Sequence, residues 1–263
     1  MKPLEVAISA ATQAGKILYD SLGRLKANQI KTKQLFDYVT KVDQDSERII
    51  VDFIRSNFPT HSILAEETGE SERKSLYRWF VDPLDGTTNY IHSFPFCAVS
   101  IALEFKKEII LGVIYDPFKD ELFRAEKNKG AFLNDKRITV SKENELSRCL
   151  IATGFPFKHK NLLALYLQTF STIFQKVSGI RRAGSAALDL AYVACGRFDG
   201  FWEIKLSPWD IAAGDILVRE AGGNLTDIIG EQNYIFSGNV VATNGLIHNS
   251  ILSMIKDVFT KNP

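Results

Sequence analysis

The chain has 263 residues, of which 45% are hydrophobic and 24% are charged, a composition typical of a globular protein. Its 32 Lys and Arg residues against 31 Asp and Glu residues give a formal net charge of +1. This balance argues against a protein that coats nucleic acid, an acidic disordered tail or a polybasic membrane anchor. The length suits one large domain or two modest ones.

The three cysteines and the apolar runs indicate where the protein resides. Cys97, Cys149 and Cys195 are odd in number, widely spaced and set in apolar contexts, which predicts buried free thiols rather than a disulfide framework. No apolar run approaches the roughly 18 residues of a membrane span. The N-terminal segment lacks the long apolar region of a signal peptide. We therefore expect a soluble, cytoplasmic protein without a membrane partner.

The first half of the chain predicts two helices followed by an antiparallel sheet. Apolar residues recur at helical spacing over 3–22, and a second helix is expected over 43–58 after a polar, lysine-bearing loop. Short apolar runs at 62–65 and 79–81 each lead directly into carboxylates. From 98 to 140 the apolar residues tend to recur at every second position, in short runs that are separated by residues typical of turns. This pattern predicts a meander of antiparallel strands.

The second half is mixed. Strands are expected at 149–153, 200–203 and 239–243, and helices over 162–175, 185–194, 207–222 and 246–259. Because helices and strands come in blocks rather than in strict alternation, the expected fold class is α+β rather than a doubly wound sheet. A domain boundary is expected near 141–147, without a flexible linker.

The strongest motif is WFVDPLDGTTN at 79–89, where an apolar strand leads into Asp82 and Asp85. Two close carboxylates repel each other unless a cation joins them, and Mg²⁺ prefers carboxylate and phosphate oxygens. Gly86 and Thr87 could offer backbone N–H groups to a phosphate. A surface turn rich in Asp and Gly is the alternative, but the apolar run before it favours a site at the end of a core strand. The spacing of the acids excludes the DxDGT loop of haloacid-dehalogenase phosphatases and an EF-hand.

Each of the other candidate acids could have either a structural role or a role at the site. Glu66 and Glu67 would be solvated if they stood alone, but like Asp82 they follow an apolar strand. Asp210 stands at the third position of a helix that starts Ser-Pro-Trp-Asp, and Asp43 could cap the second helix. The pattern alone leaves capping slightly ahead of catalysis for both. None of the four histidines has metal-ligand spacing with another.

Taken together, these segments resemble the inositol monophosphatase family of Mg²⁺-dependent, lithium-sensitive phosphatases. The resemblance covers nearly the whole chain and rests on AEE at 65–67, WFVDPLDGTTNY at 79–90, GSAALDLAYVACGRFDGFWE at 184–203 and PWDIAAGDILVREAGG at 208–223. It implies a layered αβαβα sugar-phosphatase fold with a mainly antiparallel N-terminal sheet and a smaller, mixed C-terminal sheet. Two tightly packed domains, 1–145 and 146–263, would share the site.

The resemblance also implies roles for individual residues. The ligands of two to three Mg²⁺ ions would be Glu66, Asp82, Asp85, Asp210 and the backbone carbonyl of Leu84. Asp43 and Thr87, with Glu66, would orient and deprotonate a metal-bound water. Contacts to the phosphate and the polyol would come from Leu84, Asp85, Gly86, Thr87, Gly184, Ser185, Ala186, Glu203 and Asp210. Glu67 would support the metal ligands, and a loop around 31–36 would close over the site.

The implied reaction is hydrolysis of myo-inositol monophosphates, without a covalent protein nucleophile. Glu203 favours a hydroxyl-rich ring because a carboxylate accepts hydrogen bonds from vicinal hydroxyls. Phe201, Trp202 and Lys205 stand where animal members carry small or polar groups, so a broader sugar phosphatase, a fructose-1,6-bisphosphatase or a 3′-phosphoadenosine phosphatase remains open.

From a different class, the chain could bind RNA or the transcription machinery, although the charge balance gives no expectation of a nucleic acid partner. The resemblance further implies a homodimer.

Overall fold

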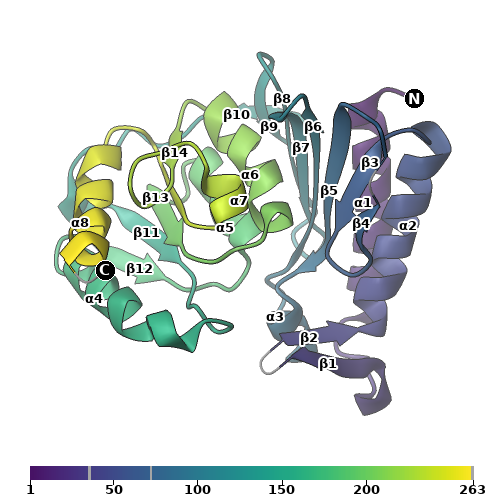
Figure 1. Ribbon diagram of the computed structural model, residues 1–263, viewed down its shortest axis with the longest axis horizontal. Coiled ribbons are helices and arrows are strands. Elements are labelled where there is room, and N and C mark those ends of the chain that lie inside the picture. Colours follow the sequence, from purple (N-terminus) through teal and green to yellow (C-terminus); the bar gives the residue numbers. More distant parts are fainter. Residues whose placement is uncertain (35–36, 72, 262–263) are drawn as a thin grey trace.

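The computed structural model describes residues 1–34, 37–71 and 73–261. Five layers follow one another across the molecule: two helices, a large sheet, two helices, a smaller sheet and two helices (Figure 1). This is the αβαβα arrangement that the resemblance implies, so the predicted fold class is confirmed. None of the helices in the described ranges combines the length and the apolarity needed to cross a membrane. Cys97, Cys149 and Cys195 are free thiols, as predicted, but only Cys97 and Cys149 are buried, whereas Cys195 is half-buried.

Helices α1 (Pro3–Ser21) and α2 (Lys41–Asn57) form the first layer and cover one face of the large sheet (Figure 1). The buried face of α1 is rich in alanine, and small side chains let a helix approach its neighbours closely. The buried face of α2 carries Ile50, Val51 and Ile54. Both helices lie within two residues of the ranges expected from periodicity.

The large sheet has eight strands in the order β10-β9-β8-β7-β6-β5-β3-β4. In chain order they are β3 (Ser62–Ala65), β4 (Gly69–Ser71), β5 (Tyr77–Asp85), β6 (Ala98–Phe105), β7 (Glu108–Asp116), β8 (Glu121–Glu126), β9 (Gly130–Leu133) and β10 (Lys136–Ile138). Every neighbouring pair is antiparallel except β3 and β5, which run parallel. The predicted meander is confirmed.

The smaller sheet has five strands in the order β12-β11-β13-β15-β14. They are β11 (Leu150–Thr153), β12 (Gly179–Arg181), β13 (Gly200–Glu203), β14 (Asn224–Thr226) and β15 (Val240–Thr243). Strand β11 is parallel to both of its neighbours, whereas β15 is antiparallel to both of its own. The sheet is mixed, as expected.

Helices α5 (Ala186–Ala194) and α6 (Pro208–Glu220) lie between the two sheets, and α4 (Leu163–Phe174) and α8 (His248–Lys261) cover the outer face of the smaller one (Figure 1). Two glycines make this packing possible. A Cβ at Gly112 of β7 would lie 2.7 Å from the carbonyl oxygen of Ala213, and one at Gly214 would lie 2.4 Å from the side chain of Leu190. Glycine therefore lets α6 contact both the large sheet and α5.

One buried cluster contains residues of both sheets, for example Phe80 and Ala102 of the large sheet and Phe201 and Val240 of the smaller one. A shared core of this kind ties the two halves together. The division into domains 1–145 and 146–263 stays a prediction.

Two local predictions were wrong. The lysine-bearing loop before the second helix contains a two-stranded antiparallel ribbon, β1 (Ile30–Gln34) with β2 (Asp37–Thr40), preceded by a short 3₁₀ turn, η1 (Ala27–Gln29). The ribbon packs little apolar surface, so its sequence lacks the alternation by which strands are predicted. Phe36, in the loop expected to close over the site, lies outside the described residues.

The second error concerns the turn expected at Asp82. Strand β5 continues through Asp85, and its pairing with β6 shifts register between Asp82 and Asp85. Pro83 has no N–H group to donate to a neighbouring strand, which accounts for the irregularity. The short strands β4, β12 and β14 and two short helices, α3 (Thr87–Ile91) and α7 (Tyr234–Ser237), were also not predicted as separate elements.

Candidate active site

A cleft of about 1060 Å³, its open mouth included, gathers most of the residues singled out in the sequence. It lies where the end of β5 and the start of α3 meet the start of α5, the end of β13 and the start of α6. The predicted residues on its wall are Glu66, Asp82, Leu84, Asp85, Gly86, Thr87, Gly184, Ser185, Ala186, Glu203 and Asp210. These residues span 145 positions of the sequence, and the fold brings them to one place.

The parallel pairing of β3 with β5 explains why Glu66 lies beside Asp82. Ala65 pairs with Val81, and the next amide, that of Glu66, donates a 3.1 Å hydrogen bond to the carbonyl oxygen of Val81. Because parallel strands end at the same edge of a sheet, the residues that follow each strand are neighbours. Both apolar runs that lead into acids therefore deliver those acids to one edge.

Hydrogen bonds fix the irregular end of β5 from two sides. The Asp82 carboxylate accepts a 2.9 Å bond from the amide of Leu84, and the hydroxyl of Ser46 in α2 donates to the carbonyl of Pro83 at 2.9 Å. Asp85 accepts bonds from the Ser185 hydroxyl at 2.6 Å and the Ala187 amide at 2.7 Å. Ser185, which the resemblance assigns to the polyol, thus also holds Asp85 in place.

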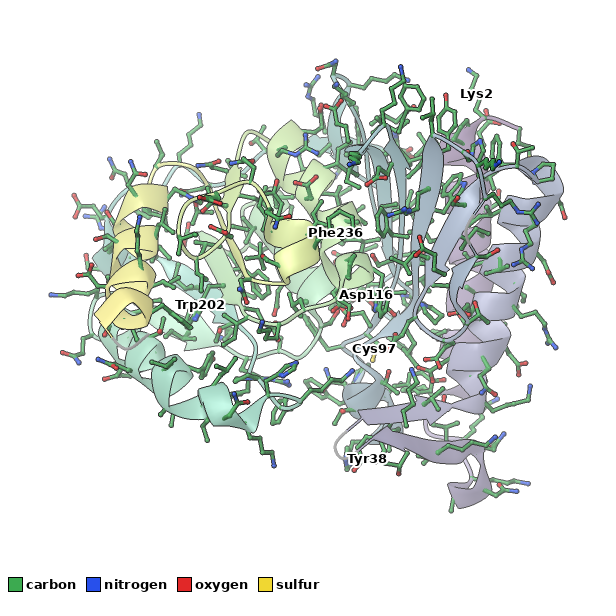
Figure 2. All side chains as sticks on the ribbon, viewed as in Figure 1. Lys2, Tyr38, Cys97, Asp116, Trp202 and Phe236 are labelled. Carbon is green, nitrogen blue, oxygen red and sulfur yellow. The ribbon has the colours of Figure 1, made fainter. Side chains whose placement is uncertain are left out.

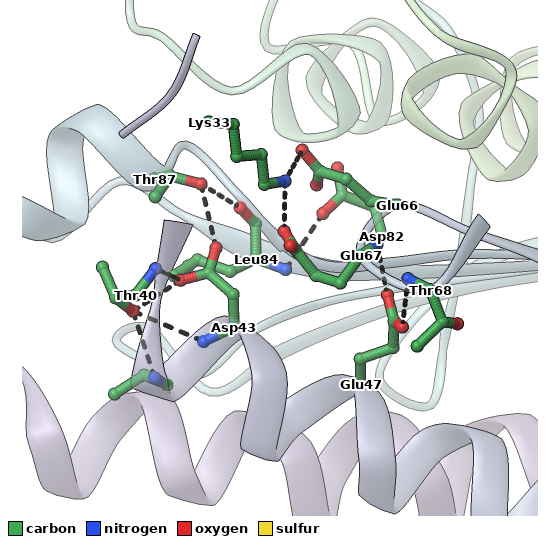
Figure 3. Close-up of polar contacts among 11 residues, drawn as sticks. Lys33, Thr40, Asp43, Glu47, Glu66, Glu67, Thr68, Asp82, Leu84 and Thr87 are labelled. Atoms are coloured by element: carbon green, nitrogen blue, oxygen red, sulfur yellow. Dashed lines mark hydrogen bonds and ion pairs between the residues drawn. The ribbon is translucent and has the colours of Figure 1, made fainter. Parts of the chain in front are cut away.

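Asp43 lies behind the cleft wall in a closed set of hydrogen bonds (Figure 3). Its Oδ2 accepts from the amide of Thr40 at 2.8 Å and from the Thr40 hydroxyl at 2.5 Å, while the Thr87 hydroxyl lies 3.1 Å from both Asp43 Oδ1 and the Leu84 carbonyl oxygen. Thr40 is the N-cap of α2, so Asp43 takes part in capping and also contacts Thr87. The capping role of Asp43 is confirmed, and its catalytic role stays a prediction.

The acids that follow β3 are held by two charged side chains (Figure 3). Glu47 of α2, which is 1% exposed, accepts the amides of Glu67 at 2.7 Å and Thr68 at 2.9 Å. Lys33 of β1 places its ammonium group 2.5 Å from Glu67 and 3.4 Å from Glu66. Glu67 thus lies next to the cleft acid Glu66, between the ribbon and α2.

Asp210 and Glu203 complete the acidic set on the opposite side. Asp210 accepts a 2.7 Å bond from the amide of Ser207, the N-cap of α6, so it caps the helix and faces the cleft at the same time. Glu203 ends β13 beside Gly154, where an added Cβ would lie 2.0 Å from the Glu203 carboxyl group. A side chain at 154 would therefore displace the Glu203 carboxyl group from its present position.

Crowding of acids in a buried place raises their pKa values. Burial raises the pKa of Asp82 well above its usual range, and the charges of Glu66, Asp85 and Asp210 raise it further. Burial likewise raises the pKa of Asp85 to about 6. Burial also raises the pKa of Asp210, and the charges of Asp85 and Glu66 raise it further. Burial raises the pKa of Asp43 to about 6, of Glu67 to about 7 and of Glu203 to about 8. These carboxylates would be relieved by a cation placed among them.

The donor set fits a hard divalent cation. Glu66, Asp82, Asp85 and Asp210 offer carboxylate oxygens and Leu84 a carbonyl oxygen, which are the ligands that Mg²⁺ prefers. In Asp82, Asp85 and Asp210, hydrogen bonds occupy one carboxylate oxygen and leave the other without a partner among the described residues. As they stand, no three His, Cys, Asp or Glu side chains of the described chain form a group tight enough to hold a metal ion.

The prediction for Phe201 and Trp202 was wrong. Both are buried in the smaller sheet, at 0% and 1% exposure, and neither lines the cleft, whereas Lys205 does. Figure 2 shows Trp202 at the smaller sheet. In β13 side chains alternate between faces, and both faces of this strand are covered by helices. The aromatic residues of β13 therefore belong to the core and say nothing about the ligand.

Sequence reasoning missed several polar residues at the site, among them Glu47, Arg182 and Asp189. Arg182 and Asp189 line the cleft. A signal for Asp189 existed, because it is the single charged residue in the apolar helix segment AALDLAYVA. Burying a lone carboxyl group inside a helix costs free energy, so such a residue indicates a functional role.

The comparisons with known proteins agree with this geometry. The sequence model described as the inositol monophosphatase family matches residues 2–259. Nus factor SuhB of Escherichia coli strain K12 is 44% identical over 255 residues, covering 97% of this chain and 96% of the relative. The crystal structure of extragenic suppressor protein suhB from Bartonella henselae superposes with a TM-score of 0.92 at 45% identity, covering 96% and 97% of the two chains. Inositol monophosphatase from Anabaena sp. PCC 7120 gives a TM-score of 0.87 at 43% identity, covering 97% and 95%.

Proposed function

The chain belongs to the inositol monophosphatase family, and from this premise we propose that it is a Mg²⁺-dependent phosphatase that hydrolyses myo-inositol monophosphates to inositol and phosphate. The observation that carries the proposal is the single cleft in which Glu66, Asp82, Asp85 and Asp210 meet, next to the Asp43–Thr87 pair. A phosphate monoester is itself an anion, so it enters such an acidic cleft only together with cations.

We assign two to three Mg²⁺ ions to Glu66, Asp82, Asp85, Asp210 and the Leu84 carbonyl. When bound, these ions would neutralise the phosphate charge and lower the pKa of a bound water. The chain's own contribution is to fix the carboxylates, through Ser185 and the Ala187 amide at Asp85 and through the Leu84 amide at Asp82. Glu67 and Glu47 would hold the segment that carries Glu66.

Asp43 and Thr87 would move the proton. The Thr87 hydroxyl donates to Asp43, so its oxygen can accept a hydrogen bond from the attacking water. Burial raises the pKa of Asp43 to about 6, which makes it a better base than an exposed aspartate while leaving it ionised at neutral pH. Glu66, which follows β3, would assist from beside Asp82.

The remaining cleft residues would bind the substrate. Gly86 and Thr87 lie at the start of α3, where N–H groups lack partners within the helix and can contact the phosphate. Gly184, Ser185, Ala186 and Glu203 lie on the wall towards α5 and β13 and would contact the polyol. Lys158, Arg182 and Lys205 also line the cleft and add positive charge for an anionic ligand.

The test is phosphate release by the purified chain from myo-inositol 1-phosphate, fructose 1,6-bisphosphate and 3′-phosphoadenosine 5′-phosphate, with and without Mg²⁺. We expect inositol phosphate to be the best substrate, EDTA to abolish its turnover and Mg²⁺ to restore it. Asp85→Asn should lose about 10³-fold in kcat/KM, because metal ions contribute several kcal/mol to such reactions. Asp135→Asn, an exposed aspartate outside the cleft, is the control. Turnover of inositol phosphate far below that of the other two would contradict the substrate assignment, and activity that persists in EDTA would contradict the metal assignment.

A second candidate, from a different class, comes from the name of the Escherichia coli relative, Nus factor SuhB. If this chain also associated with the transcription machinery, that role would not need the cleft acids. A strain that carries only Asp85→Asn separates the two, since a cellular role that survives without hydrolysis would make binding the main function. The cleft chemistry favours hydrolysis.

Three further properties belong to the same proposal. The protein would form a homodimer, which sedimentation or light scattering would reveal. Lithium in the millimolar range would inhibit hydrolysis by competing at the Mg²⁺ ligands. The protein would act in the cytoplasm on a small phosphorylated polyol or sugar.

A further inference from the structure

Asp189 is a buried acid on the cleft wall to which the proposed mechanism gives no task. It lies in the first turn of α5, three residues after Ala186, and is 1% exposed. Its position near the helix N-terminus favours a negative charge. Its surroundings do not, because burial raises the pKa of Asp189 well above its usual range, and Glu203 and Asp85 raise it further.

Asp189 is the exception among the buried aspartates. None of the described residues forms a hydrogen bond with its carboxyl group, and its Oδ1 is buried without a partner. The six other buried aspartates each accept at least one hydrogen bond; they are Asp43, Asp82, Asp116, Asp199, Asp215 and Asp227. An unsatisfied carboxyl group is costly to bury, so a residue of this kind calls for a partner that arrives with the ligand.

The neighbours of Asp189 in the cleft define what that partner can be. Glu203 is close enough to raise the pKa of Asp189, and Glu203 also lacks a hydrogen-bond partner among the described residues. Arg182 lowers the pKa of Asp189, and its guanidinium group packs over the ring of Phe157 at 4.8 Å from the centroid. This end of the cleft therefore presents two carboxyl groups and one guanidinium.

We propose that Asp189 is a specificity-determining residue whose carboxyl group accepts a hydrogen bond from a ring hydroxyl of the polyol, adjacent to the hydroxyl that Glu203 binds. The inference rests on the proposed phosphatase function and extends it by one named contact. The chemical class of the ligand follows from the two carboxyl groups at this end of the cleft. Neighbouring hydroxyls can donate to both carboxyl groups at once. A second phosphate would instead meet two groups of like charge, and an apolar leaving group would leave both carboxyl groups without a hydrogen-bond donor.

The test compares a substrate that offers ring hydroxyls to this end of the cleft with one that offers none. myo-Inositol 1-phosphate carries ring hydroxyls, and p-nitrophenyl phosphate carries none. In Asp189→Ala we expect kcat/KM for the inositol phosphate to fall on the order of 10-fold or more, chiefly through KM, as for the loss of one hydrogen bond to a charged group. Turnover of p-nitrophenyl phosphate should stay within about twofold of wild type, because that substrate makes no such contact.

Asp189→Asn tests the same contact without a change of volume. Its amide oxygen can still accept a hydrogen bond, so it should recover part of the loss seen in Asp189→Ala. It also removes the buried charge, so its melting temperature at pH 8 should equal or exceed that of wild type. Asp135→Asn, an exposed aspartate, is the matched control and should alter neither substrate. Equal losses with both substrates, or no loss with either, would overturn the proposal.

A binding measurement separates this inference from the proposed function. Excess myo-inositol, without metal or phosphate, should raise the melting temperature of wild type and Asp135→Asn more than that of Asp189→Ala. If wild type hydrolyses neither substrate with Mg²⁺, the phosphatase assignment fails, and the myo-inositol shift then decides about Asp189 alone. An equal shift in Asp189→Ala, or no shift in an inactive wild type, would refute the contact.

Discussion

The two sides of the cleft hold their carboxyl groups in different ways. On the side of the large sheet, Asp43, Asp82 and Asp85 each accept hydrogen bonds from threonine or serine hydroxyls or from backbone amides. On the opposite side Asp210 accepts the Ser207 amide, whereas Asp189 of α5 and Glu203 of β13 accept no hydrogen bond from the described residues. Fixed carboxylates suit metal ions, which need ligands in set positions. Carboxyl groups without partners suit a ligand that brings its own hydroxyls. Under the proposed function, this difference would divide the cleft into a reaction end, where the metal ions bind, and a recognition end around Asp189 and Glu203, where the polyol binds.

The largest effect should come from the reaction end. In Asp82→Asn the amide oxygen can still accept the Leu84 N–H, so the geometry of β5 is kept while the charge is lost. We expect a loss of about 10³-fold in kcat/KM, equal for inositol phosphate and p-nitrophenyl phosphate, because metal-dependent stabilisation of the reacting phosphate serves both. Parallel assays of the two substrates check this. A loss confined to the polyol substrate would contradict the division of the cleft.

The reaction end was also the more predictable of the two. Asp82 and Asp85 stand in one short motif, and the parallel ends of β3 and β5 place Glu66 beside them. Local patterns predicted most helices and the meander for the same reason, since periodicity and capping are properties of neighbouring residues.

What local patterns could not predict depends on contacts between distant segments. The bond from Ser185 to Asp85 joins residues 100 positions apart. Glu47 looks like an ordinary surface acid of an amphipathic helix, and only the fold shows that it binds the amides of Glu67 and Thr68. The β1–β2 ribbon escaped detection because its strands carry no alternating apolar pattern. Burial of Phe201 and Trp202 likewise depends on the helices that cover β13.

The next largest effect concerns Glu47, which would position Glu66 through the segment that follows β3. Glu47→Ala removes the acceptor of two amide groups, so the segment should move and Mg²⁺ affinity should fall about 10- to 100-fold, the range seen when residues that orient metal ligands are removed. kcat at saturating Mg²⁺ should change much less. Glu47→Gln keeps one acceptor oxygen, so its Mg²⁺ affinity should lie between those of wild type and Glu47→Ala. Mg²⁺ titrations of activity and calorimetry measure these differences; unchanged Mg²⁺ affinity would exclude the positioning role.

The raised pKa values predict how stability depends on pH. Asp43 and Asp85 titrate at about 6, Glu67 at about 7 and Glu203 at about 8, whereas unfolded carboxyl groups titrate near 4. Between about pH 4 and 8 the folded chain therefore binds more protons than the unfolded chain. Its free energy of unfolding should fall as pH rises through this window.

Metal should reverse part of that loss, which sharpens the contrast between the two ends. Mg²⁺ replaces protons among the ligands, so the rise in melting temperature on adding Mg²⁺ should be larger at pH 8 than at pH 5.5. In Glu203→Gln, at the recognition end, the Mg²⁺ effect should remain, while part of the pH dependence above pH 7 should disappear. Thermal unfolding in EDTA and in Mg²⁺ at both pH values tests this. A Mg²⁺ effect that is independent of pH would argue against carboxylate ligands with raised pKa values.

The smallest effect concerns Lys33, whose ammonium group contacts Glu67 at 2.5 Å and Glu66 at 3.4 Å. The ammonium group partly satisfies Glu66, which Mg²⁺ would also bind under the proposed function, so the two cations would compete. Lys33→Met should therefore tighten Mg²⁺ binding by a few-fold at most, because a partly exposed ion pair is a weak interaction. Lys16→Met, which breaks the exposed pair with Asp20 at 2.8 Å, is the matched control and should leave the affinity unchanged. Weaker Mg²⁺ binding in Lys33→Met would mean that Lys33 orients Glu66 for the metal, and the reaction end would then owe its fixed geometry to the β1–β2 ribbon as well as to α2 and α5.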